Sequence, residues 1–200
     1  MPRPEREQLI LGVAGQTFAR DGYHAASMAE IADLADVSKP MVYAYFGSKE
    51  ELYVAYINRM GRELLDRLMR AIGEDDPPIA RLRTRVAEFL AFVEENRDGW
   101  RVLFTEMSSS RPLAEEVADL RRQIADAISR MVKSSVNADD ALPPAAIDAI
   151  GHAIVGAGES LANWWLEHPE VPREAVADWY GGVVQAAVTA VVRRRPGSTG

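Results

Sequence analysis

Residues 25–52 read AASMAEIADLADVSKPMVYAYFGSKEEL, and this stretch decides the fold. Ser27 stands ahead of a short run in which apolar residues such as Ile31 and Ala35 recur four positions apart, which is typical of one face of a helix. A serine followed three residues later by a glutamate, as Ser27 is by Glu30, is a capping box that begins such a helix. The stretch therefore predicts a two-turn helix that starts after Ser27.

A tight turn and a second short helix follow. Asp36 and Val37 make the turn, since aspartate is among the few non-glycine residues that enter the left-handed backbone region. Ser38 caps the next helix, which tolerates Pro40 because the first helical N–H groups have no partner within the helix, and Gly47 ends it. Two short helices joined by a tight turn, the second with a polar outer face, are typical of a helix-turn-helix that reads the major groove of DNA.

The rest of the chain also has helical periodicity and lacks alternating β-branched runs flanked by hairpin turns, so we predict an all-α protein of about nine helices. Gly22 stops the first helix, and Ser48 with Glu51 forms a second capping box that begins a long fourth helix. Outside the helix-turn-helix, the predicted helices cover residues 3–20, 48–72, 79–96, 99–107, 112–136, a segment between the loop 137–143 and Pro169, and 173–194.

These helices fall into two expected domains. We expect residues 1–47 to form a helix-turn-helix domain, residues 48–195 to form a larger helical domain, and residues 196–200 to form a disordered tail. The helix that begins at Ser48 joins the two domains.

Composition limits the class of protein. The chain has 48% hydrophobic residues and no cysteine, which provides for a sizeable core and excludes disulfides and thiolate metal sites. The N-terminal residues lack the apolar core of a signal peptide, and the most apolar stretch, 141–166, is interrupted by charged and polar residues. We therefore expect a soluble, cytoplasmic protein.

The net charge of −7 argues against a protein that coats nucleic acid through overall positive charge. Residues 1–50 themselves carry five basic and seven acidic side chains. From Val37 to Lys49, however, the only charges are Lys39 and Lys49, so an otherwise acidic module offers a locally positive face for phosphate.

The stretch 25–52 resembles the signature of the tetracycline-repressor family of transcription regulators. The resemblance covers roughly the first quarter of the chain closely, and the remainder is similar in length and helix count. The family usually has glycine where Asp36 stands and often a small residue where Pro40 stands. The resemblance implies a homodimer that binds a palindromic operator and acts as a repressor released by a small molecule bound to the larger domain, with activation as the alternative. No cofactor is expected.

The resemblance also implies roles for nine residues in DNA binding. Ser27 and Lys49 would bind phosphate, and Tyr43 and Tyr45 would donate hydroxyls to phosphate or lie against sugars. The base-reading candidates follow Ser38 on the second short helix: Lys39 for guanine, and Pro40, Met41 and Ala44 for thymine methyl groups. The alternatives are that both tyrosines are half-buried packing residues and that Lys49 is an ordinary solvated lysine.

A ligand site is predicted in the larger domain. His152, Glu159 and Asn163 share one face of an otherwise apolar helix, and such a polar set fits a small-molecule cavity with mostly apolar walls. The predicted walls are Trp100, Phe104, Met107 and Trp164, and ordinary helix packing is the alternative. The three histidines are scattered, so no metal site is predicted.

The last two helices are the predicted dimer interface. Glycines cost helix propensity, and close approach of a partner helix would compensate for them. The predicted interface residues are Gly151, Val155, Gly158, Tyr180, Val184, Ala187 and Val191. Packing within one chain or a cavity wall is the competing explanation.

Two other functions compete with DNA binding. An enzyme is disfavoured because the sequence has no nucleophile elbow, phosphate loop or cluster of metal ligands. A helical adaptor that binds only protein is favoured by the acidic surface, and DNA binding that weakens steeply with salt would separate it from a regulator.

Overall fold

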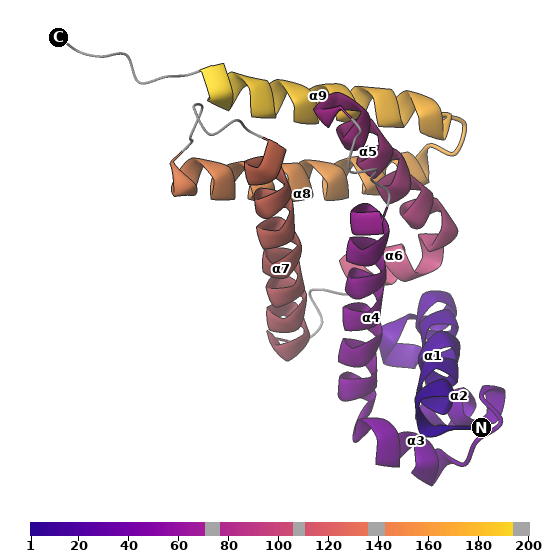
Figure 1. Cartoon of the computed structure of the whole chain (residues 1–200). Coiled ribbons are helices and arrows are strands. Elements are labelled where there is room, and N and C mark those ends of the chain that lie inside the picture. Colours follow the sequence, from indigo (N-terminus) through magenta and orange to yellow (C-terminus); the bar gives the residue numbers. More distant parts are fainter. Residues whose placement is uncertain (71–76, 106–110, 136–142, 194–200) are drawn as a thin grey trace. The chain divides into compact units, whose positions relative to one another are not determined.

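The computed structural model describes residues 1–70, 77–105, 111–135 and 143–193, and over these residues it is all-helical, as predicted. The helices are α1 (Arg3–Ala25), α2 (Met28–Leu34), α3 (Lys39–Phe46), α4 (Lys49–Arg70), α5 (Pro78–Glu95), α6 (Arg97–Thr105), α7 (Arg111–Ser135), α8 (Pro144–Glu167) and α9 (Arg173–Arg193) (Figure 1). None of these described helices is long and apolar enough to cross a membrane.

Local chemistry sets the helix boundaries near the N-terminus. Gly22 has a positive φ of 79°, which interrupts α1 where the sequence predicted its end, although helical turns resume as far as Ala25. Ser38 Oγ accepts a hydrogen bond from the Met41 N–H, and Ser48 Oγ accepts one from the Glu51 N–H, so both serine caps are confirmed. The Ser48 N–H, which a complete capping box would direct to the Glu51 side chain, donates to the Phe46 carbonyl at 2.8 Å.

The predicted capping box at Ser27 is only half correct. Ser27 Oγ does cap α2, but it accepts from the Ala29 N–H at 3.2 Å. The Glu30 carboxylate instead accepts a hydrogen bond from Arg20, which also pairs with Asp21. An ion pair with the preceding helix therefore takes the place of the second half of the box.

The chain divides into two compact units that differ from the predicted division at residue 47. Unit 1 contains residues 1–63 and 96–120, which are α1 to α3, the first part of α4, α6 and the first part of α7. Unit 2 contains residues 64–95 and 121–200. The reason for the difference is that α6 packs on α1, so a later helix joins the N-terminal ones. The predicted tail, 196–200, lies outside the described residues.

Unit 1 has a core that holds the short helices α2 and α3. Ile10, Ala14 and Phe18 of α1, with Ile31 of α2 and Val42 of α3, are fully buried. Figure 1 shows α2 and α3 packed beside α1 at the start of α4. Their inward faces are therefore fixed, which leaves their opposite faces available to other molecules.

Unit 2 is built from α5, α8 and α9 together with the remaining parts of α4 and α7. Figure 1 shows α8 and α9 running antiparallel, with α5 crossing α9. The fully buried side chains include Leu90, Val93, Trp165 and Val176. The Trp165 indole N–H donates to the Val171 carbonyl at 2.9 Å, which ties the α8–α9 connection to α8.

Candidate nucleic-acid interface and effector region

The turn between α2 and α3 has the geometry that the sequence predicts. Asp36 is the described non-glycine residue with positive φ, at 51°, and the Val37 N–H donates to the Ala32 carbonyl at 3.0 Å. Aspartate thus occupies the left-handed position where glycine is usual. The turn directs the inner face of α3, with Val42 and Phe46, into the core.

The outer face of α3 presents the predicted base-reading residues. Lys39, Pro40 and Ala44 are exposed, and Tyr43 keeps 43% of its surface accessible. Met41 is half-buried. Ser38 is exposed, and because its oxygen accepts the capping hydrogen bond, its O–H can still donate to a phosphate. A short exposed helix held on a rigid core is the arrangement that a recognition helix needs.

Tyr45 differs from Tyr43 because another side chain already covers it. It is half-buried, and the Arg3 guanidinium lies over its ring at 5.3 Å from the centroid. Arg3 thereby adds a positive charge beside α3. Sequence reasoning missed Arg3 because 42 residues separate it from Tyr45 and no periodic pattern links them.

Lys49 is neither pointed at solvent nor free. Its ammonium donates to the carbonyl oxygens of Tyr23 at 2.8 Å, His24 at 3.0 Å and Ala26 at 3.1 Å, and it lies 4.7 Å from the centroid of the Tyr23 ring. An ammonium has three N–H donors, and these three carbonyls match them. In this structure Lys49 fastens the start of α4 to the end of α1.

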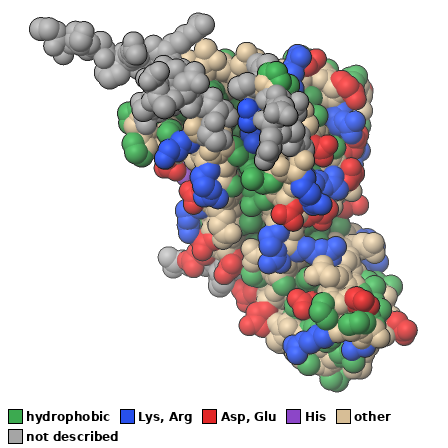
Figure 2. All heavy atoms as spheres, viewed as in Figure 1, with side chains coloured by type: hydrophobic (Ala, Val, Ile, Leu, Met, Phe, Trp, Pro, Cys, Tyr) green, Lys and Arg blue, Asp and Glu red, His purple; other side chains and the backbone are tan. Residues whose placement is uncertain are grey.

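Charge on the visible surface is mixed rather than segregated. Figure 2 shows Lys and Arg side chains interspersed with Asp and Glu over the face in view. Arg20 is paired with two carboxylates, and its hydrogen bond lowers the pKa of Asp21. Lys39 and Arg3 supply positive charge beside α3, which suits a local contact with phosphates.

The predicted ligand residues are dispersed. In unit 2, His152 is exposed beside Asp148, and Trp164 is 38% exposed and stacks on His168 at 4.4 Å between ring centroids. Asn163 is half-buried. Buried Trp100 belongs to unit 1, the side chain of Phe104 lies outside the described residues, and so does Met107.

Glu159 is the predicted ligand residue that faces the interior of unit 2. Its carboxylate accepts a hydrogen bond from Arg121 Nε of α7 at 2.8 Å. Burial raises the pKa of Glu159, and Arg121 acts in the opposite direction. The pair places a charged contact between α7 and α8.

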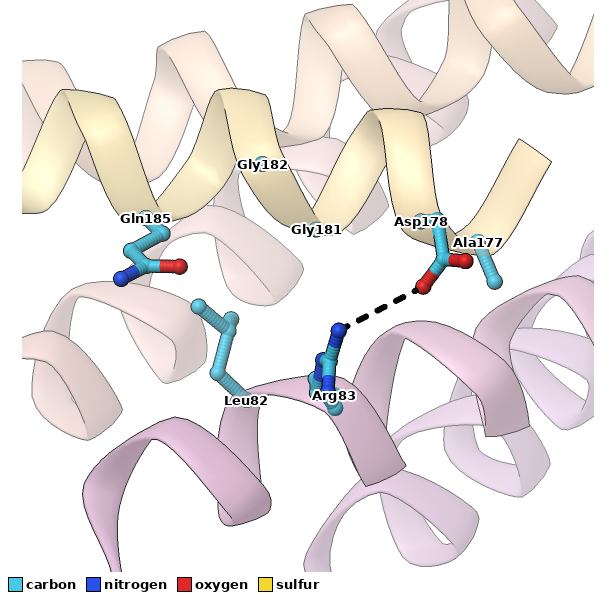
Figure 3. A pocket seen from close by; sticks show the side chains of 7 residues that line it. All are labelled: Leu82, Arg83, Ala177, Asp178, Gly181, Gly182 and Gln185. Atoms are coloured by element: carbon cyan, nitrogen blue, oxygen red, sulfur yellow. Dashed lines mark ion pairs between the residues drawn. The ribbon is translucent and has the colours of Figure 1, made fainter. Parts of the chain in front are cut away.

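A shallow groove lies elsewhere in unit 2, between α5 and α9 (Figure 3). Arg83 and Asp178 approach to 3.7 Å across it. Its lining residues are Leu82, Arg83, Ala177, Asp178, Gly181, Gly182 and Gln185. These residues include none of the predicted ligand set, and they offer little of the apolar wall that a small-molecule site uses.

Several predicted dimer residues are buried by their own chain. A Cβ at Gly151 would come within 2.7 Å of the Ala125 carbonyl oxygen, and a Cβ at Gly158 would come within 3.2 Å of Tyr180 Cζ. Tyr180 donates to the Ile154 carbonyl at 2.7 Å, and Val184 is 4% exposed. Contacts within the chain therefore account for these glycines, which is the competing explanation stated above.

The outward face of α8 and α9 carries a different set of residues. Trp179 is 55% exposed and Val183 is 58% exposed. Gly156 and Gly182 are exposed, and a Cβ at either would meet nothing within 4 Å. Val155 and Ala187 of the predicted set are half-buried, and the side chain of Val191 lies outside the described residues. We call the exposed set Gly156, Ala157, Trp164, Trp179 and Val183 the outer apolar face.

The caps, the turn and the exposed α3 together define a helix-turn-helix DNA-binding module. Comparison with known proteins gives its family. Residues 10–56 match “Bacterial regulatory proteins, tetR family”, and residues 78–187 match “Tetracyclin repressor-like, C-terminal domain”. The chain belongs to the tetracycline-repressor (TetR) family of DNA-binding transcription regulators, which is a family of regulators and not of enzymes.

Individual relatives agree with this assignment. The chain is 33% identical over 168 residues to the HTH-type transcriptional activator FasR of Mycolicibacterium smegmatis, which covers 84% of this chain and 75% of the relative. A TetR-like regulator from Rhodococcus sp. RHA1 is 32% identical with a TM-score of 0.71, over 94% of this chain and 98% of that one. A tetR-family regulator from Streptomyces coelicolor is 28% identical with a TM-score of 0.76, over 97% and 89%.

Proposed function

We propose that this chain is a homodimer that reads a palindromic operator with α3 and is a repressor released by a small molecule. The observation that carries the proposal is the outer face of α3, where Lys39, Pro40, Tyr43 and Ala44 are exposed on a helix whose other face is locked in the core. A single such helix buries too little surface for selective binding, so two copies are needed.

The contacts follow from the chemistry of each side chain. Lys39 donates to guanine, while Pro40, Met41 and Ala44 meet thymine methyl groups. The hydroxyls of Ser27, Ser38, Tyr43 and Tyr45 donate to the DNA backbone, and Arg3 adds charge next to Tyr45. For Lys49 we propose an indirect role, because its donors are directed at three carbonyls of the α1 end.

The outer apolar face is the proposed contact between the two subunits. Exposed tryptophan and valine beside bare glycine backbone allow close packing of symmetry-related helices. A two-fold dimer then sets its α3 helices about 34–36 Å apart, or a multiple of that distance, to match successive major grooves. A compound that binds better to a form in which the α3 helices have another spacing weakens DNA binding. The loss in DNA-binding free energy is set by the difference between the compound's binding free energies for the two forms.

The effector site and the sense of regulation are tested separately. The effector lies in the C-terminal domain, where Glu159 and Asn163 supply polar groups among apolar side chains. The relative FasR is called an activator, so activation is the alternative to repression for this chain. A reporter gene placed behind the operator in a host cell shows the sense of regulation, since a repressor lowers its expression and an activator raises it.

The decisive experiment is selection of bound sites from random duplexes by the full chain. A palindrome bound by a dimer, with affinity that falls steeply as salt rises, supports the proposal. Candidate compounds are then screened for release from the selected site. A monomer that enriches no duplex at low ionic strength would overturn the proposal in favour of a protein adaptor.

A further inference from the structure

A single tyrosine of α4 contacts two other helices of unit 1 through glycines. A Cβ added at Gly15 of α1 would overlap the Tyr56 ring, lying 2.8 Å from Cζ. A Cβ added at Gly99 of α6 would overlap the Tyr56 hydroxyl oxygen, while Cζ would lie 3.4 Å away. The ring therefore rests on bare backbone of α1, and the hydroxyl rests on bare backbone of α6.

The surroundings hold Tyr56 at a fixed place. The side chain is only 8% exposed, and burial raises its pKa to about 12, so the hydroxyl stays protonated at neutral pH. The Phe18 ring lies 6.3 Å away between centroids, and one turn further along α4, Arg59 donates to the Gln8 carbonyl of α1 at 3.1 Å. The α1–α4 contact is thus anchored on both sides of the tyrosine.

Gly15 and Gly99 destabilise their helices relative to alanine, unless the close approach of Tyr56 compensates for this. Both lie within helices, where alanine would favour the helical conformation more strongly. Neither position has a positive φ that would demand glycine. What glycine provides at each position is space for Tyr56, so the length of this side chain sets the spacing between α1 and α6.

We propose that Tyr56 is a positioning residue for DNA binding, which fixes α1, and with it α2 and α3, relative to α4 and α6. This inference rests on the proposed operator binding by α3. Its consequence is that a change at Gly99, in a helix outside the helix-turn-helix, alters DNA binding through the Tyr56 hydroxyl. In a close-packed interior such a displacement is transmitted because neighbouring side chains leave no slack.

The test is a double-mutant cycle in the full-length chain, read on the duplex that the wild type selects. Gly99→Ala should weaken binding about tenfold, since overfilling a packed site shifts its neighbours. Tyr56→Phe removes the atom that the new methyl group would strike and should weaken binding only a few-fold. In the Tyr56→Phe background, Gly99→Ala should then have no further effect, because its nearest atoms lie at ordinary contact distance.

Gly15→Ala is the matched control, because its methyl group would strike the ring carbons that phenylalanine retains. Its loss of affinity should persist in the Tyr56→Phe background. Preferred half-site spacing and thermal midpoint are measured in parallel, since a purely structural role lowers the midpoint without changing the spacing preference of the folded dimer.

Two results would overturn the inference. The first is a folded Gly99→Ala protein that binds the duplex as the wild type does. The second is an equal loss from Gly99→Ala in both backgrounds. If the wild type selects no duplex, the proposed function fails instead, and the two failures are thereby distinguished.

Discussion

The helix pairs α2–α3 and α8–α9 turn opposite kinds of surface outward. The exposed face of α3 and its cap carry the Ser38 hydroxyl, the Lys39 ammonium and the Tyr43 phenol. The exposed face of α8 and α9 carries Trp179 and Val183 beside bare glycine. Charged and hydroxyl groups keep their water until a polyanion displaces it, whereas an apolar face gains by leaving water altogether.

This difference indicates a division of labour within one chain. Contact through charges is reversible and depends on salt, as an operator contact that must be released requires. Contact through apolar area persists when conditions change, as a permanent subunit contact requires. A substitution on either face should therefore have a distinct signature.

The largest expected effect comes from placing a charge on the outer apolar face. Val183→Asp should dissociate the dimer, because burying an unpaired carboxylate costs several kcal/mol, which corresponds to more than about a hundredfold in the dimer dissociation constant. Analytical ultracentrifugation measures this constant, and operator affinity should fall with it.

Gln185→Asp is the matched control, since Gln185 is exposed on the same helix but borders the groove toward α5. It should leave the dimer intact. A Val183→Asp protein that sediments as a dimer would remove the outer apolar face from the interface.

The sequence predicted the features that short-range chemistry determines. The caps at Ser38 and Ser48, the break at Gly22 and the left-handed Asp36 each depend on a few neighbouring residues. These features fix the direction of α3, and so Lys39, Pro40, Tyr43 and Ala44 are exposed as predicted, whereas Met41 and Tyr45 are half-buried.

Contacts between distant segments were not predictable in the same way. Arg121 and Glu159 are 38 residues apart, and the fit of Tyr56 between Gly15 and Gly99 has no sequence pattern. The glycines of α8 show most clearly what the sequence does not predict, because a small residue allows close packing against a partner subunit and against the chain's own helices equally well. Only the packing distinguishes Gly158, which faces Tyr180, from Gly156, which faces open space.

The second prediction concerns the half-buried ion pair of Arg121 and Glu159 in unit 2. Burial raises the pKa of Glu159, so the carboxyl favours the fold when protonated, and this contribution is lost as pH rises through its folded-state pKa. Arg121→Met removes the opposing cation and should cost about 2–3 kcal/mol near neutral pH, with a thermal midpoint that falls as pH rises.

The control is the double variant Arg121→Met with Glu159→Gln, which has no carboxyl to titrate. Its thermal midpoint should recover near neutral pH and lose the added pH dependence. An equal slope in both variants would show that another group is responsible. Operator affinity of the folded dimer should change little, which distinguishes this half-buried pair from the outer face of α3 and the outer apolar face.

A smaller effect is expected at the junction of α1 and α4. Lys49→Met removes three charge-assisted hydrogen bonds to carbonyls and should lower the free energy of unfolding by about 1–2 kcal/mol. Operator affinity should fall without a change in the slope of log affinity against log salt. A slope reduced by about one would instead mean that Lys49 neutralises a phosphate.

The smallest effect is expected at Lys39, where the polar face of α3 meets a single base. Lys39→Ala should weaken binding to the selected duplex by about 1 kcal/mol, or roughly five-fold, and should leave the unfolding midpoint unchanged because the side chain is exposed. Exposed Lys133 of α7 provides the matched control, and Lys133→Ala should leave affinity unchanged.

The informative measurement is a panel of duplexes with each operator position substituted in turn. If Lys39 reads a base, the Lys39→Ala protein no longer discriminates between bases at one position of each half-site. If Lys39 binds phosphate, Lys39→Ala weakens binding to all duplexes alike and reduces the slope of log affinity against log salt. Loss of discrimination at one position would show that α3 reads sequence through its polar face, while uniform weakening would reassign Lys39 to the DNA backbone and leave base reading to Pro40, Met41 and Ala44.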